Sequence, residues 1–195
     1  KNKLTADFCA APGGKTFQLL NFGGNVESFE KNKVRAKLMQ ENLKRLKFNC
    51  KLTIQDVLTI SNKKRFDLII LDAPCSSIGT IRRHPEIFFR KIDPDFNKII
   101  SLQKELLDKA IKILNINGIL IYMVCSFLAE EGKTQINNFL KKNKNFSLVK
   151  FSSQSLKLEK SFIDKNGFYF VLPSKLENGI LIDGFFAAKL KKNDK

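Results

Sequence analysis

Residues 4–16 read Leu-Thr-Ala-Asp-Phe-Cys-Ala-Ala-Pro-Gly-Gly-Lys-Thr, an apolar run that passes into a glycine turn. The run is typical of a buried strand at 4–10, and the glycines predict a turn into a helix at 14–21. Six further stretches are predicted strands: 25–30, 50–55, 66–72, which is almost continuously apolar, 119–124, 147–151 and 184–190. Helical periodicity lies between them at 31–47, at 95–114, where Asn117-Gly118 would end the helix, and at 130–142. This alternation predicts a three-layer α/β fold, a mostly parallel seven-stranded sheet with helices on both faces.

Composition predicts one soluble domain. The chain has 195 residues, of which 43% are hydrophobic and 28% charged, as in ordinary globular proteins. We assign one domain to residues 1–190 and a frayed basic tail to 191–195. No apolar run approaches the ~20 residues that span a bilayer, and no signal peptide is found. We therefore expect a cytoplasmic protein that binds no membrane.

The net charge of +16, with a pI near 9.8, is the strongest bias in the composition. Such an excess attracts polyanions through counterion release, which indicates a nucleic acid partner. The alternative is a lysine-rich composition inherited from an AT-rich genome, and composition alone weighs the two equally.

The cysteines indicate a reducing compartment and no metal site. They stand at 9, 50, 75 and 125 without CxxC spacing, and His84 is the single histidine. Cys75 and Cys125 each follow a predicted strand. Ligands of open α/β sheets bind at the carboxyl ends of the strands, so either cysteine is a candidate nucleophile there. The alternative for Cys75 is a small buried apolar side chain, the usual fate of an unpaired cysteine.

The glycine turn must first be tested against a phosphate-binding P-loop, which it resembles at Gly14-Lys15. A P-loop has glycine five residues before that pair, but Cys9 stands there. The opening of the helix can still bind an anionic group, and the carboxylate of S-adenosylmethionine is a candidate. Glu30 and Asp56, at the next two strand ends, suit ribose hydroxyls and an adenine edge. The alternatives are an ordinary strand-to-helix turn and two capping or solvated acids.

The stretch 77–94 is long, basic and aperiodic, which predicts a functional loop with one short helix. Arg82 and Arg83 in it suit phosphate or base contacts, although a solvated loop would also carry arginines.

Five ordered motifs make the chain resemble the catalytic domain of the RsmB/Sun family of RNA (cytosine-carbon-5) methyltransferases. They are Asp-Phe-Cys-Ala-Ala-Pro-Gly-Gly-Lys-Thr (7–16), Asp-Ala-Pro-Cys-Ser (72–76), Arg-Arg-His-Pro-Glu-Ile (82–87), Cys-Ser (125–126) with Glu-Glu (130–131), and Asp-Gly-Phe-Phe-Ala-Ala (183–188). The family has Ser-Thr before its Cys-Ser and Pro-Glu-Glu-Asn after it, whereas this chain has Met123-Val124 and Ala129-Glu-Glu-Gly132. The cysteine and both acids are retained, so we keep the activity.

The resemblance implies a Rossmann-like methyltransferase fold that uses S-adenosylmethionine. It assigns cofactor binding to Cys9, Ala10, Ala11, Pro12, Gly13, Gly14, Lys15, Glu30, Asp56 and Asp72. It makes Cys125 the nucleophile, and Cys75 the group that assists its release. Asp72 would stabilise the adduct and Lys15 would supply positive charge. RNA would be bound by Arg82, Arg83 and His84.

The substrate implied by residues 82–87 is ribosomal RNA of the small subunit, and we expect a monomer. Family members carry RNA-binding sequence before the first strand, and the chain starts at Lys1, so we expect that region to be absent from this chain. A DNA methyltransferase would attack with Cys75, but Cys125-Ser126 and residues 82–85 weigh against it. Two alternatives remain open: a transfer RNA methyltransferase would differ only in substrate, and a ribosome-assembly factor would bind RNA without catalysis.

Overall fold

The computed structural model describes residues 3–91, 93–152, 160–176 and 178–194, which form two compact units. The first unit comprises 3–73, 105–121 and 192–194, and the second comprises 74–104 and 122–191. Two elements contribute to both units: α3 (Phe96–Ile113) and β5 (Leu114–Val124).

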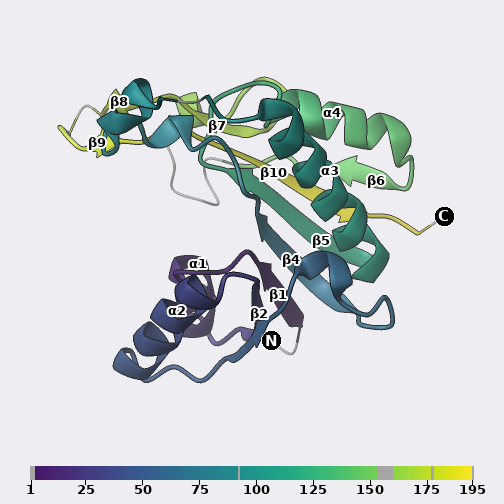
Figure 1. Ribbon diagram of the computed structural model, residues 1–195. Coiled ribbons are helices and arrows are strands. Elements are labelled where there is room, and N and C mark those ends of the chain that lie inside the picture. The colour runs from purple at the N-terminus through teal and green to yellow at the C-terminus, as the bar shows by residue number, and fades with distance from the viewer. Residues whose placement is uncertain (1–2, 92, 153–159, 177, 195) are drawn as a thin grey trace. The chain divides into compact units, whose positions relative to one another are not determined.

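The first unit is a parallel sheet with helices (Figure 1). Its other elements are β1 (Leu4–Phe8), α1 (Gly14–Asn21), β2 (Asn25–Glu30), α2 (Lys33–Arg45), β3 (Lys51–Ile54), the 3-10 helix η1 (Val57–Thr59) and β4 (Phe66–Asp72). The strand order is β3-β2-β1-β4-β5, and β1 runs parallel to both of its neighbours. Phe29 lies at the centre of the core, edge-on to the rings of Phe8 (5.5 Å) and Phe66 (6.1 Å). This parallel order brings the ends of β1 and β4 to one edge.

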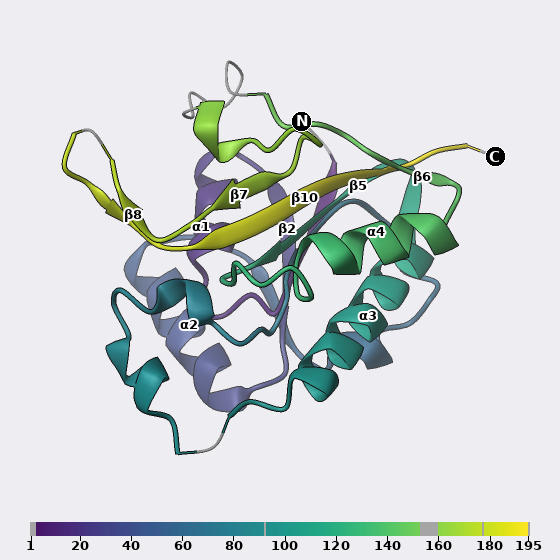
Figure 2. The same ribbon diagram turned by 90° about the horizontal axis from the view of Figure 1, so that it is seen from above.

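The second unit is built around β10, beside which β7 runs antiparallel (Figure 2). Its other elements are the 3-10 helices η2 (Ile78–Thr80), η3 (Pro85–Phe89) and η4 (Lys160–Phe162), α4 (Lys133–Lys142), β6 (Phe146–Leu148), β7 (Tyr169–Val171), the hairpin of β8 (Ser174–Lys175) and β9 (Leu181–Ile182), and β10 (Phe185–Lys192). The strand order is β5-β10-β6. Buried Tyr122 and Phe168 pack against Phe186, with ring centroids 6.5 and 5.3 Å away.

The predicted α/β class and mostly parallel sheet are confirmed, and the path of the sheet has the expected seven strands. The short strand β7, which pairs beside that path, was not predicted. The first strand ends at Phe8 and not at residue 10, because Cys9 has a φ of 59° and leaves the extended conformation. Among the described helices, none is long and apolar enough to cross a membrane.

Three local predictions were wrong. Asn117-Gly118 does not end a helix: β5 already begins at Leu114, and Asn117 bends the strand with a φ of 59°. Lys191 and Lys192 are not a tail but the end of β10, and the Lys192 ammonium donates to the carbonyls of Ile111 and Leu114. The loop at 77–94 contains two 3-10 helices, not one short helix. Residue 195 lies outside the described residues.

Candidate active site

The turn after β1 depends on Gly13. This residue has a φ of 111°, and a Cβ there would lie 2.1 Å from the ring of Phe17. Its N–H donates to the Ala10 carbonyl at 2.8 Å, which closes the turn directly before α1. The first N–H groups of a helix have no acceptor within the helix, so the turn presents donors at the N-terminus of α1.

A cavity of about 400 Å³ opens beside this turn in the first unit. It is lined by Asp7, Ala10, Ala11, Pro12, Gly14, Lys15, Gln18 and Asp72. The structure thus brings together six of the ten residues predicted to bind the cofactor. The other four, Cys9, Gly13, Glu30 and Asp56, are not in its lining.

Asp7 is the most unusual group in the lining. It is fully buried, and its Oδ2 accepts a hydrogen bond from the Thr16 hydroxyl at 2.6 Å. Its Oδ1 has no hydrogen-bond partner among the described residues. Burial raises the pKa of Asp7 to about 6, although the Thr16 hydrogen bond acts in the opposite direction. A buried carboxylate oxygen without a donor is rare, and here it belongs to a residue that lines a cavity.

Lys15 and Asp72 face each other across the same cavity as an ion pair, with Nζ and Oδ2 2.6 Å apart. Both side chains are about 30% exposed, at 32% and 27%. The two charged residues of this unit that were predicted to be catalytic, Lys15 and Asp72, therefore pair with each other.

Glu30 is a buried acid that stabilises the glycine turn. Its side chain is 4% exposed, and its two oxygens accept from the N–H groups of Ala11 (3.3 Å) and Asn32 (2.9 Å). Arg35 lies 3.6 Å from the same carboxylate and donates to the Ala11 carbonyl. A carboxylate has about four lone-pair sites, so Glu30 retains acceptor capacity after these contacts.

Asp56 caps η1, because its Oδ1 accepts from the Leu58 N–H at 2.9 Å. This is the capping role that the sequence left open. Its Oδ2 lies 3.7 Å from the Lys31 ammonium, and the side chain is 38% exposed. One oxygen of Asp56 is therefore used by the fold, and the other faces an exposed lysine.

The turn after β4, which carries Cys75, is anchored to Glu131 in the second unit. Glu131 is fully buried and accepts from the Ser76 N–H (2.8 Å), the Ser76 hydroxyl (2.6 Å) and the Gln103 amide (3.1 Å). The Ser76 hydroxyl also lies 3.4 Å from that of Ser126, the residue after Cys125. These contacts fasten the two cysteine-bearing segments to each other.

A second set of hydrogen bonds holds the backbone of Cys125. The Gly79 N–H donates to the Cys125 carbonyl at 3.0 Å, and the Gly184 N–H donates to the Gly79 carbonyl at 2.8 Å. A Cβ on Gly79 would lie 2.1 Å from the Gly184 carbonyl oxygen. Only glycine at 79 allows this approach, so three segments distant in the chain meet at the predicted nucleophile.

The surroundings of Cys75 keep its thiol protonated. All four cysteines of the chain are thiols. Burial raises the pKa of Cys75 to about 11, and the charges of Glu131 and Cys125 act in the same direction. Cys75 is therefore protonated at neutral pH and a poor nucleophile, but it can act as a proton donor. Burial also raises the pKa of Cys9, to about 12.

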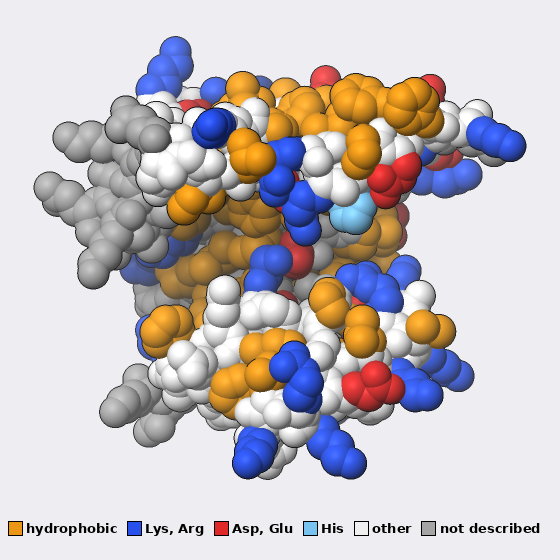
Figure 3. Space-filling view, turned by 90° about the vertical axis from the view of Figure 1, so that its left-hand side faces the viewer, with side chains coloured by type: hydrophobic (Ala, Val, Ile, Leu, Met, Phe, Trp, Pro, Cys, Tyr) orange, Lys and Arg blue, Asp and Glu red, His pale blue; other side chains and the backbone are white. Residues whose placement is uncertain are grey.

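Arg82 and Arg83 are paired within the second unit. Both donate through Nε to the carboxylate of Asp183, at 3.1 Å for Arg82. His84 lies 3.0 Å from Glu86, so its ring is also engaged. Two guanidinium groups share one carboxylate, which leaves a net positive charge. Lys and Arg side chains are scattered over the face drawn in Figure 3 and do not form one continuous patch.

Two residues of this arrangement, Asp7 and Glu131, belong to the sequence motifs but were not predicted to be site residues. An acid inside the apolar run 4–10 is a detectable signal for Asp7, because a buried charge there needs a partner. Glu131 offered no such signal, since its partner Ser76 lies 55 residues earlier in the chain. No three His, Cys, Asp or Glu side chains are grouped as metal ligands in the described part of the chain.

The comparisons with known proteins agree with one another. The family model for 16S rRNA methyltransferase RsmB/F matches residues 1–191. The ribosomal RNA small subunit methyltransferase B of Photorhabdus laumondii is 36% identical over 193 residues, and that of Cronobacter sakazakii 38% over 192. Both alignments cover 95% of this chain and 41% of the relative, so the chain spans about two fifths of the length of these curated relatives.

Solved structures show the same similarity. The crystal structure of PH0851 superimposes with a TM-score of 0.84 and 31% identity, covering 97% of this chain and 42% of that one. The structure of NSun6 from Pyrococcus horikoshii with SFG gives 0.78 and 28%, covering 100% and 49%.

Proposed function

Because the chain belongs to the 16S rRNA methyltransferase RsmB/F family, we propose that it transfers a methyl group from S-adenosylmethionine to carbon 5 of cytosine in RNA. The first candidate substrate is small-subunit ribosomal RNA, after the names of the relatives. One observation carries the proposal: hydrogen bonds among Glu131, Ser76 and Ser126 hold the two cysteine-bearing segments together, and burial raises the pKa of Cys75 to about 11. A protonated Cys75 suits a proton donor, and the family resemblance assigns the attack to Cys125.

The cavity of the first unit fits the methionine part of the cofactor. The unpartnered Oδ1 of Asp7 suits the ammonium group, and the donors at the N-terminus of α1 suit the carboxylate. Glu30 has acceptor capacity left for the ribose hydroxyls, and Oδ2 of Asp56 for the adenine amine. When bound, S-adenosylmethionine would supply an electrophilic methyl group.

The chemistry of the chain's own residues follows from the roles that the family resemblance assigns to the two cysteines. The Cys125 thiolate would add to carbon 6 of cytosine, which makes carbon 5 electron-rich enough to take the methyl group. By family resemblance, Asp72 stabilises the adduct at the ring nitrogen and Lys15 supplies positive charge. A base then removes the carbon 5 proton, and the electrons expel the Cys125 sulfur. Cys75, held protonated, would assist that release.

Arg82 and Arg83 would contact RNA with the donors that Asp183 does not use. Both are bound to Asp183 through Nε, so their terminal NH2 groups can bind phosphate oxygens. Replacing both by alanine should weaken RNA binding and reduce its salt dependence, while cofactor affinity stays unchanged. Filter binding at several salt concentrations, with calorimetry of the cofactor, measures this. If the double variant binds RNA as tightly as the wild type, the excess positive charge reflects a lysine-rich composition and not RNA binding.

The proposed function is tested with the full-length protein, labelled S-adenosylmethionine, and ribosomal or transfer RNA from a strain that lacks the gene. We expect label in the small-subunit RNA, at a cytosine that bisulfite sequencing then locates. Label in transfer RNA would change the substrate class. Binding of RNA without any incorporated label would identify a non-catalytic assembly factor instead.

A further inference from the structure

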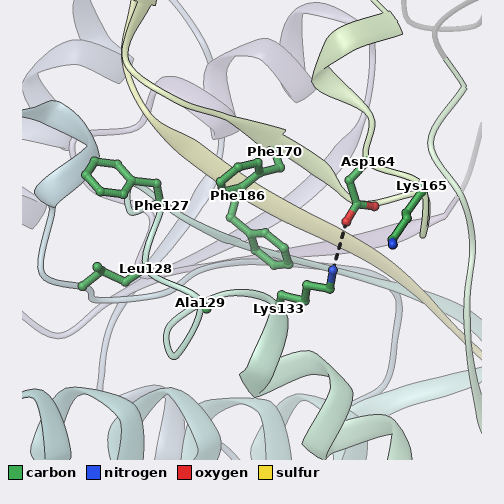
Figure 4. A pocket seen from close by; sticks show the side chains of 8 residues that line it. All are labelled: Phe127, Leu128, Ala129, Lys133, Asp164, Lys165, Phe170 and Phe186. Carbon is green, nitrogen blue, oxygen red and sulfur yellow. Dashed lines mark ion pairs between the residues drawn. The ribbon is translucent and has the colours of Figure 1, made fainter.

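A cavity of about 350 Å³ in the second unit has no part in the chemistry described above (Figure 4). It is lined by Phe127, Leu128, Ala129, Lys133, Asp164, Lys165, Phe170 and Phe186. Phe127, the first of these residues, lies two positions after Cys125, so the Cα atoms of the two residues are at most ~7 Å apart. The volume lies at the lower end of the range of small-ligand pockets, which suits a single flat ring system.

The floor and walls of this cavity are aromatic. Phe186 on β10 is opposite Phe170 on β7 in the antiparallel register, so both side chains emerge on the same face. Phe186 is 2% exposed and forms the floor, whereas Phe127 and Phe170 are only half-buried. A Cβ on Gly184 would lie 2.8 Å from the ring of Phe127, so glycine there lets that ring pack closely against the backbone. The walls are thus in place without a ligand.

The rim of the cavity is positively charged. Lys133 and Lys165 lie on either side of Asp164 in Figure 4, and Lys133 pairs with that carboxylate at 3.5 Å. Asp164 also accepts from the backbone N–H groups of Asn166 (2.8 Å) and Phe168 (3.1 Å). The single acid among the lining residues is therefore engaged by the fold, and two ammonium groups beside one carboxylate leave the rim with a net positive charge that attracts phosphates.

We propose that this cavity binds the unpaired nucleobase next to the target cytosine, with the open faces of Phe127 and Phe170 stacking on the base and Lys133 and Lys165 near its phosphates. This inference rests on the proposed function. An enzyme that takes a cytosine out of the stack leaves its neighbour with one exposed face. Aromatic side chains replace that lost stacking for any base, because every base has a π-face.

The occupant is identified by photocrosslinking in the full-length protein. The probe is a short RNA that spans the methylated cytosine and carries 5-iodouridine on one side of it or the other. We expect one of the two positions to crosslink to Phe127 or Phe170, as located by mass spectrometry of the digested adduct. A segment of the full-length protein that filled the cavity would exclude the base, and the crosslink would lie elsewhere, which would overturn the proposal.

Kinetics give an independent test on the same RNA. Phe127→Ala and Phe170→Ala should each raise the KM for RNA at least fivefold and change kcat less than twofold, while Phe127→Tyr and Phe170→Tyr retain the ring and the affinity. An abasic nucleotide at the crosslinked position should cause the same loss in the wild type and no further loss in the alanine variants. Phe22→Ala, which removes an 85% exposed ring of the first unit, is the control.

The outcomes separate this inference from the function on which it rests. If the wild type methylates RNA and the alanine variants keep its KM, the cavity binds no base. If the wild type methylates no cytosine, the proposed function itself fails. Thermal unfolding of each variant identifies any loss of RNA affinity that comes from misfolding.

Discussion

Asp7 in the first unit and Glu131 in the second are both fully buried carboxylates, yet their surroundings differ. Glu131 receives three hydrogen bonds, two from Ser76 and one from Gln103. Asp7 receives one from Thr16 at Oδ2, and its Oδ1 has none from the described residues. Buried acceptors without donors cost stability, and native structures contain only a few of them. Among the described residues the other such side-chain atom is Oε1 of Gln103.

The two carboxylates therefore differ in what the protein itself supplies to them. The protein supplies every hydrogen bond that Glu131 receives, and these bonds hold the Cys75 turn. Oδ1 of Asp7 lacks a donor among the described residues, and Asp7 lines a cavity in which a bound ligand could supply one. The predictions test this contrast and begin with the proposed chemistry of Cys75 and Cys125, whose segments are connected through Glu131 and Ser76.

The largest effect concerns the two cysteines of the second unit. Cys125→Ala should abolish methyl transfer and give no covalent complex, because no thiolate remains to attack carbon 6. Cys75→Ala should still methylate RNA but accumulate a protein–RNA adduct, because the proton donor for release is lost. A denaturing gel of each variant after incubation with RNA and cofactor distinguishes the two.

The control for this experiment is Cys50→Ala, since Cys50 lies on neither cysteine-bearing strand end and bonds to the Val26 carbonyl and Ser28. It should behave as the wild type. A stable adduct with Cys125→Ala that is absent with Cys75→Ala would exchange the two roles.

The second prediction compares the stability of the two carboxylate variants. Glu131→Gln loses one acceptor oxygen for Ser76 and should lower the free energy of unfolding by about 1–3 kcal/mol. Asp7→Asn removes a charge whose burial is unfavourable at pH 8, so its stability should equal or exceed that of the wild type. Urea denaturation measures both. Glu130→Gln, an exposed neighbour, is the matched control for Glu131.

The contrast fails if Asp7→Asn is as destabilised as Glu131→Gln, since Asp7 would then be fully satisfied by the fold. It also fails if Glu131→Gln unfolds at the wild-type urea concentration.

The sequence predicted the fold and the glycine turn after the first strand because both depend on local patterns. The alternation of apolar and periodic stretches located the strands, and the glycines at 13 and 14 located the turn whose positive φ the structure shows. The contacts that assemble the second unit are non-local. Gly79 meets Gly184 and Cys125 across long separations, and Arg83 pairs with Asp183 100 residues away. No periodicity records such pairs, so the predicted RNA-binding arginines gave no sign of their internal carboxylate partner.

The third prediction concerns pH and Asp7. Its folded pKa, about 6, is raised above the ordinary value of 3.8, so folding favours the protonated form of Asp7 in the protein without cofactor, and protonated Asp7 contributes stability. That stability is fully present below pH 3.8 and is lost as the pH rises through about 6. An ammonium group bound at Oδ1 requires the ionised form, so cofactor affinity should change in the opposite direction.

Calorimetry with S-adenosylhomocysteine should therefore show affinity falling up to about tenfold per pH unit below pH 6 and level above pH 7. In Asp7→Asn this pH dependence should disappear. If the variant keeps the wild-type profile, some other group titrates with binding.

The smallest effect concerns Asp56, which is intermediate between Glu131 and Asp7. Only one of its oxygens accepts a hydrogen bond from the fold. Asp56→Asn retains an oxygen for the Leu58 N–H but replaces the outer acceptor by an amide NH2, which cannot accept from adenine. We expect unchanged stability and a cofactor affinity about fivefold lower, which corresponds to one neutral hydrogen bond of about 1 kcal/mol. Asp56→Ala removes the cap as well and should lower both quantities. Calorimetry and urea denaturation of the two variants measure this, and an Asp56→Asn variant with wild-type affinity would show that Asp56 only caps the 3-10 helix.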